Sequence, residues 1–187
     1  TFSFFFSHHI STMEGGMVIT DDQELYHILL SLRAHGWTRN LPEQNHVAPK
    51  SPDDFKELFN FVLPGYNLRP LEMSGAIGSI QLKKFPKFLI QRIENAKMFL
   101  EKMQKHDYIY TQKEIGLSSW FGFSIVLKPD SDRNRDQLIN VLNKKGFECR
   151  PIVAGNFAKN KVVEFFNKEF HDELNNANWI DKNGLFI

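Results

Sequence analysis

Apolar and polar positions recur with clear periods along much of the chain, and these patterns predict its helices and strands. Apolar residues dominate 1–6, TFSFFF, and also 15–20, which opens with two glycines, so we expect two buried strands around a turn. Apolar residues then recur at helical spacing from Leu25 to Leu32. Asp22 is a good N-cap residue and Gly36 a good terminator, which predicts a helix between them.

The stretch 37–64 has no clear period, contains Pro42, Pro49 and Pro52 and includes one short helical patch at 53–62. A loop of this length in a compact domain usually has a function. Pro70 then suits the first turn of a helix. Small residues in that helix predict close packing against a neighbour: Ser74, Gly75, Ala76, Gly78 and Ser79.

We expect Pro86 to separate this helix from a second, amphipathic helix that runs to about His106. Its expected inward face consists of Phe88, Ile90, Ile93, Ala96 and Leu100. The remainder predicts a small α+β domain, with a strand at 118–127, a helix at 131–146, a strand at 147–153 and a strand-like end at 183–187. Both ends of the sequence are apolar, whereas domain boundaries usually fall in polar linkers, so we expect part of a longer chain.

Composition and charge narrow the classes of partner. The formal net charge of the 187 residues is +1, which argues against nucleic acid or an anionic membrane surface as a partner. A single cysteine, Cys149, excludes a disulfide framework and a metal or iron–sulfur site built from several cysteines. The sequence has no signal peptide and no apolar run of about 18 residues, so we expect a cytoplasmic protein.

Two adjacent histidines, His8 and His9, lie between the first two predicted strands. Most histidines near a strand end are structural, with their ring nitrogens hydrogen-bonded. However, small polar neighbours leave room here for a ligand, and α/β sheets collect their active sites at strand ends. A histidine can take up and return a proton near neutral pH, although spacing alone names no reaction.

The segment SFFFSHHISTMEGG, residues 3–16, resembles the cofactor-lysine segment of the DegT/DnrJ/EryC1/StrS sugar aminotransferases. These are fold-type I enzymes that depend on pyridoxal phosphate (PLP), and their usual pattern is Ser-Phe-x-x-x-Lys-Asn-Ile-x-x-x-Glu-Gly-Gly. The lysine of the pattern holds PLP as a Schiff base. Ser3, Ile10 and Glu14 set the register, which places His8 on the lysine position and His9 on the asparagine that follows it.

The histidine is typical of the C3-dehydratase branch of that family, and other segments resemble the branch that acts on GDP-linked 4-keto-6-deoxy sugars. They are LRAHGWTRNLP, FVLPGYNLRPLEMSGAIG, SSWFGFS and CRPIVAGNF. The resemblance implies that pyridoxamine phosphate (PMP) is used to remove the C3 hydroxyl, with His8 as base and then acid. Glutamate would regenerate PMP, and the product would be a 4-keto-3,6-dideoxy sugar of the colitose type found in O-antigens.

The resemblance also assigns further residues. Ser3 matches a serine that binds the cofactor phosphate, and Asn67 matches an asparagine that reaches that phosphate from the other subunit of a homodimer. His35 is a candidate for the substrate site. Arg39 and Arg69 are candidates for the diphosphate or for the carboxylate of glutamate. The alternatives are a backbone-bonded hydroxyl for Ser3, a turn residue for Asn67, a helix cap for His35 and surface ion pairs for the arginines. His9 is expected to be structural.

The resemblance implies an α/β fold-type I PLP-dependent transferase, of which the sequence holds a part. Residues 1–68 would be the C-terminal part of the large cofactor-binding domain, 69–106 the connecting helices, and 107–187 most of a small α+β domain. The expected ligands are PLP or PMP, a nucleotide sugar and glutamate, without a metal, an iron–sulfur cluster, nucleic acid or a membrane. The phosphate loop, the ring-stacking aromatic and the aspartate at the ring nitrogen cannot be located, so we expect residues 1–187 alone to be inactive.

Two other functions stay open. One is a nucleotide-sugar aminotransferase of the perosamine-synthase type, against which His8 itself argues. The other is a non-catalytic family member, against which the matches at Ser3, Asn67 and Arg69 argue.

Overall fold

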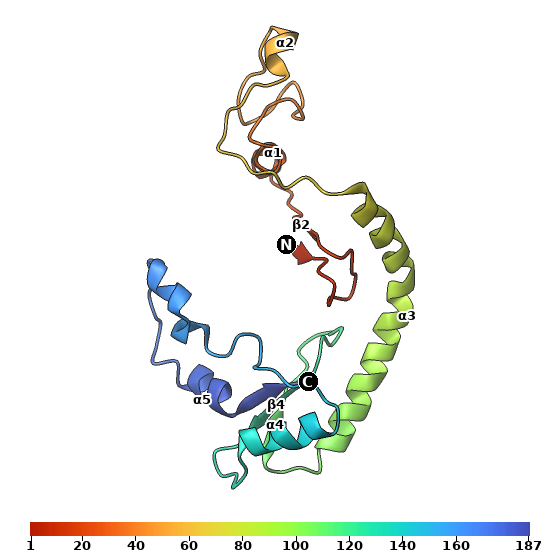
Figure 1. The fold of residues 1–187 in the computed structure, drawn as a ribbon, viewed down its shortest axis with the longest axis vertical. Coiled ribbons are helices and arrows are strands. Elements are labelled where there is room, and N and C mark those ends of the chain that lie inside the picture. The colour runs from red at the N-terminus through yellow and green to blue at the C-terminus, as the bar shows by residue number, and fades with distance from the viewer. The chain divides into compact units, whose positions relative to one another are not determined.

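The computed structural model describes residues 1–187, which form two compact units, 1–86 and 87–187 (Figure 1). A single long helix, α3 (Glu72–Met103), contributes its first part to unit 1 and its second part to unit 2. No helix of the structure is both long and apolar enough to cross a membrane.

In unit 1 the two predicted strands are present but short. β1 (Phe2–Ser3) and β2 (Gly16–Met17) pair antiparallel, with Phe2 opposite Met17 and Ser3 opposite Gly16. The expectation that they are buried is wrong, because Phe2 is 55% exposed and Met17 43% exposed. These strands pair only with each other, so no second layer covers their side chains.

The first helix is confirmed. α1 (Gln23–Leu32) begins where the Asp22 carboxylate accepts a hydrogen bond from the Leu25 backbone N–H at 3.1 Å. In the long loop, the predicted patch at 53–62 contains only the one-turn helix α2 (Asp54–Glu57), capped by Asp53. The patch ends early because Phe61 leaves it to form a bridge with Trp37.

Pro86 does not separate two helices, since α3 continues through it. Proline removes one helical hydrogen bond and crowds the carbonyl four residues earlier. Pro86 and Leu82 are both exposed, so water can satisfy that carbonyl. The predicted inward face is also partly wrong: Ala96 is 1% exposed, whereas Phe88 is 42% and Ile90 60% exposed.

Unit 2 contains a three-stranded antiparallel sheet of order β3-β4-β5, formed by Ile109–Thr111, Ser124–Leu127 and Gly184–Phe186. Two helices belong to it, α4 (Arg135–Lys144) and α5 (Asn175–Asn183), together with 3-10 turns at Phe157–Lys159 and Lys161–Phe165. The core is made by Ile109, Ile125, Leu127 and Leu185, and side chains of α3 and α4 pack against it. Unit 2 therefore combines an antiparallel sheet with helices.

The details of unit 2 differ from the expectation. The strand predicted at 118–127 covers only 124–127, because Trp120 has a φ of 49° that breaks the extended run. The strand predicted at 147–153 is reduced to isolated bridges, of Arg150 with Phe186 and of Val153 with Gly155. β3 was not expected, whereas the helix at 131–146 is confirmed as α4.

Candidate active site

The histidines lie in the loop between β1 and β2, residues 4–15, which we call the histidine loop. Its base is closed by backbone hydrogen bonds of 2.9 Å from Phe4 N to Gly15 O and from Thr12 N to Phe4 O. The Thr12 hydroxyl donates to the Glu14 carbonyl at 2.7 Å, and Thr12 is 5% exposed. Backbone bonds and one buried threonine therefore fix the ends of the loop.

Gly15 is required by this geometry. Its φ is +142°, and a Cβ built on it would lie 2.9 Å from the Thr12 hydroxyl oxygen. The first part of α3 approaches the loop from outside, where a Cβ on Gly78 would lie 3.0 Å from the Thr12 Cγ2. The small residue at this point of α3 thus allows close packing against the histidine loop of the same chain.

His8 is half-buried, and its orientation is set within the loop. Its backbone N–H donates to the Phe5 carbonyl at 2.9 Å, and its ring meets the Phe5 ring edge-on with 6.0 Å between centroids. The Nδ1 lies 3.3 Å from the Ser3 carbonyl oxygen. A carbonyl can only accept, so Nδ1 carries the proton of this bond, and Nε2 is the basic nitrogen of the neutral ring.

The neighbouring residues have different surroundings. The ring of His9 meets Phe85 of α3 edge-on, with 6.4 Å between centroids. The Ser3 hydroxyl accepts a long hydrogen bond of 3.4 Å from Phe5 N, so its proton can be donated elsewhere. Ser3 therefore contacts His8 through its carbonyl, and its hydroxyl proton is available to another acceptor.

A second group of candidate residues lies where two chain segments cross after α1. His35 has a φ of 63°, and its N–H donates to the Tyr66 carbonyl at 2.8 Å. Next to it, Gly36 and Gly65 touch: a Cβ on Gly65 would lie 2.0 Å from the Gly36 nitrogen. Only glycines allow this approach, which brings the His35 segment beside the Asn67 segment.

The second group contains one tight side-chain stack. The Cζ of Arg39 lies 3.7 Å from the centroid of the Trp37 ring, and the His35 ring meets that indole edge-on with 5.1 Å between centroids. Asn67 pairs with Ala34 through a backbone bridge and is exposed, as is Arg69 two residues later. His35, Arg39 and Asn67 are thus near one another, held by backbone pairing and by the Trp37 ring.

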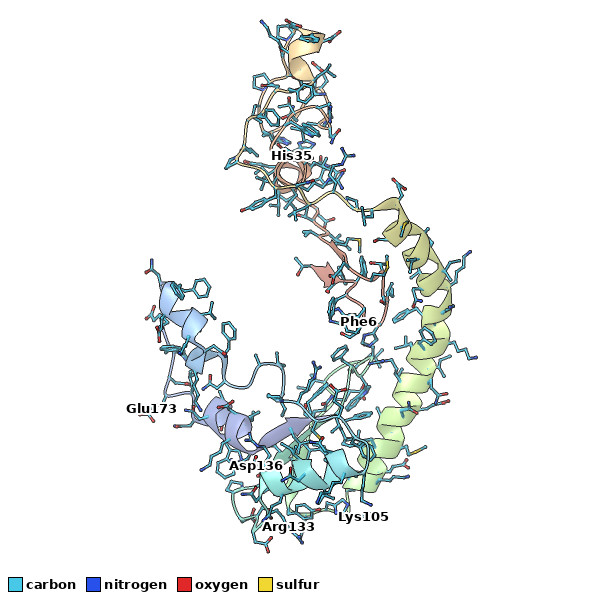
Figure 2. The ribbon with its side chains drawn as sticks, viewed as in Figure 1. Phe6, His35, Lys105, Arg133, Asp136 and Glu173 are labelled. Carbon is cyan, nitrogen blue, oxygen red and sulfur yellow. The ribbon has the colours of Figure 1, made fainter.

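The predicted site residues therefore fall into two separate groups within unit 1. Ser3 of β1 and His8 of the histidine loop form one group, whereas His35, Arg39, Asn67 and Arg69 belong to the crossing and the chain that follows it. Figure 2 shows the two locations, marked by Phe6 and His35, well apart. One chain does not bring all six residues to one point.

Glu57 of α2 organises the long loop and was missed by sequence reasoning. Its carboxylate accepts a hydrogen bond from the Thr38 hydroxyl, one from Ser51 N at 2.8 Å and one from the Asn60 amide at 3.3 Å. The Thr38 bond is the main cause that holds the pKa of Glu57 below its ordinary value of 4.5; Ser51, Asn60 and Lys50 add to it, and desolvation opposes it. One of these partners, Thr38, lies 19 residues away in the sequence, a contact that no local motif reveals.

The donor set of the histidine loop fits a phosphate-bearing cofactor that is not covalently attached. His8 has no primary amine, and a serine hydroxyl lies on the adjoining strand. No three histidine, cysteine, aspartate or glutamate side chains gather as they would around a metal ion.

The chain resembles known sugar-modifying enzymes over its whole length. It is 59% identical to GDP-4-keto-6-deoxy-D-mannose 3-dehydratase of Escherichia coli O55:H7 and 61% identical to the enzyme of that name from Yersinia pseudotuberculosis, and both alignments cover 100% of the chain. It covers 49% and 48% of these enzymes. The chain therefore spans about half the length of the curated relatives it matches.

Solved structures show the same similarity. The E. coli GDP-4-keto-6-deoxy-D-mannose-3-dehydratase with bound hydrated PLP superposes with a TM-score of 0.95 at 59% identity, over 100% of this chain and 48% of that one. Two structures of GDP-4-keto-6-deoxymannose-3-dehydratase have TM-scores of 0.95 at 58% identity, over 100% of this chain and 49% of each of theirs. One contains a trapped PLP-glutamate geminal diamine, and the other is a histidine-to-asparagine mutant with bound GDP-perosamine.

The chain accordingly has the fold of about half of a PLP-dependent fold-type I enzyme, as expected. The sequence pattern of the DegT/DnrJ/EryC1/StrS aminotransferase family matches residues 1–187. On this match, the chain belongs to the DegT/DnrJ/EryC1/StrS aminotransferase family.

Proposed function

We propose that this chain is part of an enzyme that removes the C3 hydroxyl of GDP-4-keto-6-deoxy-D-mannose, with glutamate as the amino donor. The observation that carries the proposal is His8, which the sequence resemblance assigns to the position of the family's cofactor lysine and whose Nδ1 is directed at the Ser3 carbonyl. The 59–61% identity to dehydratases of that name supports the same substrate. When bound, PMP supplies an amine for the C4 ketone of the sugar and an electron sink for the reaction.

His8 performs the proton transfers in this proposal. With Nδ1 bonded to the Ser3 carbonyl, Nε2 accepts a proton and then donates it to the departing C3 hydroxyl. The carbonyl bond persists in both protonation states, because Nδ1 is a donor in each. The ring therefore changes charge without changing its orientation.

Ser3 and Asn67 are proposed to bind the cofactor phosphate from two subunits of a homodimer. The separation of the two groups within unit 1 supports this arrangement, because each group would complete the site of the other subunit. Exposed apolar side chains near Asn67 give the dimer a surface to bury: Tyr66 is 62%, Leu68 67% and Leu71 66% exposed. His35, Arg39 and Arg69 are proposed to contact the substrates.

The remaining expectations belong to the same proposal. Residues 1–68 would be part of the large domain, 69–106 the connection and 107–187 the small domain. The proposal also includes a cytoplasmic location and a role in making a colitose-type sugar.

The test is a mass spectrum of the nucleotide-sugar product. The full-length enzyme is incubated with PLP, glutamate and GDP-4-keto-6-deoxymannose, and we expect a product that lacks one oxygen, together with released ammonia. His8→Asn keeps a hydrogen-bonding side chain but no basic nitrogen, so the rate should fall by about 10²–10⁴-fold. His9→Asn, at the position where the family has asparagine, is the matched control and should retain most of the activity.

Each alternative predicts a different spectrum. A product that carries an amine on the sugar would support an aminotransferase and contradict the proposed dehydratase. Unchanged substrate, together with failure of the full-length protein to bind PMP, would support a non-catalytic member.

A further inference from the structure

His35 and Arg39, which the proposed function places in contact with the substrates, lie close to the crossing. The Trp37 ring contacts both of these side chains. The Arg39 Cζ lies 3.7 Å from the centroid of the indole, and the His35 ring lies against its edge. Phe59 flanks the same guanidinium at 5.8 Å. A planar guanidinium above an aromatic face is attracted by the negative charge of the ring face.

The Trp37 ring is a rigid support. It is 7% exposed, and its centroid lies 6.5 Å from that of Phe59 and 6.1 Å from that of Phe61. Its backbone is also held, because the Ser31 hydroxyl donates to the Trp37 carbonyl at 3.1 Å. Arg39 therefore stacks on a surface that cannot easily move.

The indole N–H of Trp37 indicates that this residue has a role besides packing. Trp37 Nε1 is buried and has no hydrogen-bond acceptor, which costs free energy that a phenylalanine would not incur. What tryptophan offers over phenylalanine is the strongest cation-binding face. Arg39 in turn forms no ion pair with a carboxylate of this chain.

We infer that Trp37 is a positioning residue, whose indole holds the Arg39 guanidinium in place for an oxyanion of the substrate. This inference rests on the proposed function. The fork of arginine donors fits a phosphate or a carboxylate, so the anion is the diphosphate of the nucleotide sugar or a carboxylate of glutamate.

The test compares Trp37→Phe and Trp37→Leu with the wild-type full-length enzyme. Trp37→Phe keeps an aromatic face and removes the unpaired N–H, so the melting temperature should not fall. The KM for one of the two substrates should rise a few-fold in Trp37→Phe and about tenfold in Trp37→Leu, with kcat within about twofold. A rise for the nucleotide sugar assigns the diphosphate, and a rise for glutamate assigns the carboxylate.

A double-mutant cycle separates positioning from an independent effect. Arg39→Gln should raise the same KM, and adding Trp37→Leu to it should have little further effect. Arg133→Gln is the control, because that guanidinium lies 5.3 Å from the Tyr108 ring in unit 2 and should leave both KM values unchanged.

Additive effects in the cycle would overturn the inference, as would unchanged KM values in Trp37→Leu. So would a lower melting temperature of Trp37→Phe with an equal loss of kcat, since that pattern indicates a role in packing. Substrate binding is also measured by calorimetry. A wild type without turnover would contradict the proposed function, while the binding ratios of the variants would still test Trp37.

Discussion

Each of the two units of this chain is stabilised by a different kind of interaction. Unit 2 has a three-stranded sheet and a core of its own: Ile109, Ile125, Leu127 and Leu185. In unit 1 the only buried hydrophobic residues are Ala34, Trp37 and Leu41, and its strands are two residues long. Close glycine contacts, backbone hydrogen bonds and the Glu57 carboxylate hold the segments of unit 1 together. All six candidate site residues lie in unit 1, the unit with less packing.

The largest effect should come from the core of unit 2. Leu185→Ala removes the largest fully buried side chain, so the free energy of unfolding should fall by about 2–5 kcal/mol, measured by denaturant titration. Leu117→Ala is the matched control, because that leucine is fully exposed and its loss should change stability by less than about 0.5 kcal/mol. Equal losses in the two variants would contradict the idea that unit 2 depends on its core.

The next effect should come from the glycine crossing of unit 1. In Gly65→Ala the new methyl group would lie 2.0 Å from Gly36 N and 2.2 Å from the His35 carbonyl carbon, and neither backbone atom can rotate away. We expect a loss of about 2–3 kcal/mol and faster hydrogen exchange at the His35 amide. Gly75→Ala is the control: it lies in α3 with open space around it, and it should gain about 0.5–1 kcal/mol. A stable Gly65→Ala variant with unchanged exchange would show that the crossing is not required.

The smallest effect should come from Glu57 and should depend on pH. The folded state holds the pKa of Glu57 below its ordinary 4.5, so its carboxylate stabilises the fold above that pH and loses this effect as the pH falls through the lower folded-state pKa. Glu57→Gln should therefore cost about 1 kcal/mol at pH 7 and progressively less below pH 4.5. The exposed Glu101→Gln is the control for general charge effects. A difference between wild type and Glu57→Gln that stays constant across this pH range would contradict the assignment.

The sequence predictions succeeded where the signals that define an element are local. α1 and α4 could be predicted because their start and stop signals are local: Asp22 and Asn134 cap them with their own side chains. The exposed strands at Phe2 and Met17 could not, since an apolar sequence indicates burial but does not say what covers it. Local rules also failed at Pro86, where the cost of one missing hydrogen bond did not end a helix of 32 residues.

The candidate site was predictable where a linear motif carries it. His8 and Ser3 lie five residues apart, and their hydrogen bond lies within that motif. Trp37 and Glu57 were missed, because their roles depend on contacts with residues far away in the sequence, such as Phe61 and Thr38. Neither residue matches a motif, and only the folded loop gives it a role.

The contact between Gly36 and Gly65 has a consequence for how this protein can evolve. Because the crossing fixes the two ends of the loop between them, residues can be gained or lost in the parts of the loop that do not contact Glu57 or Trp37 without moving those ends. Both glycines are expected to be retained, since a side chain at either one would overlap the backbone of the other segment. New specificities could therefore arise in this family by exchanging loops between a constant pair of glycines.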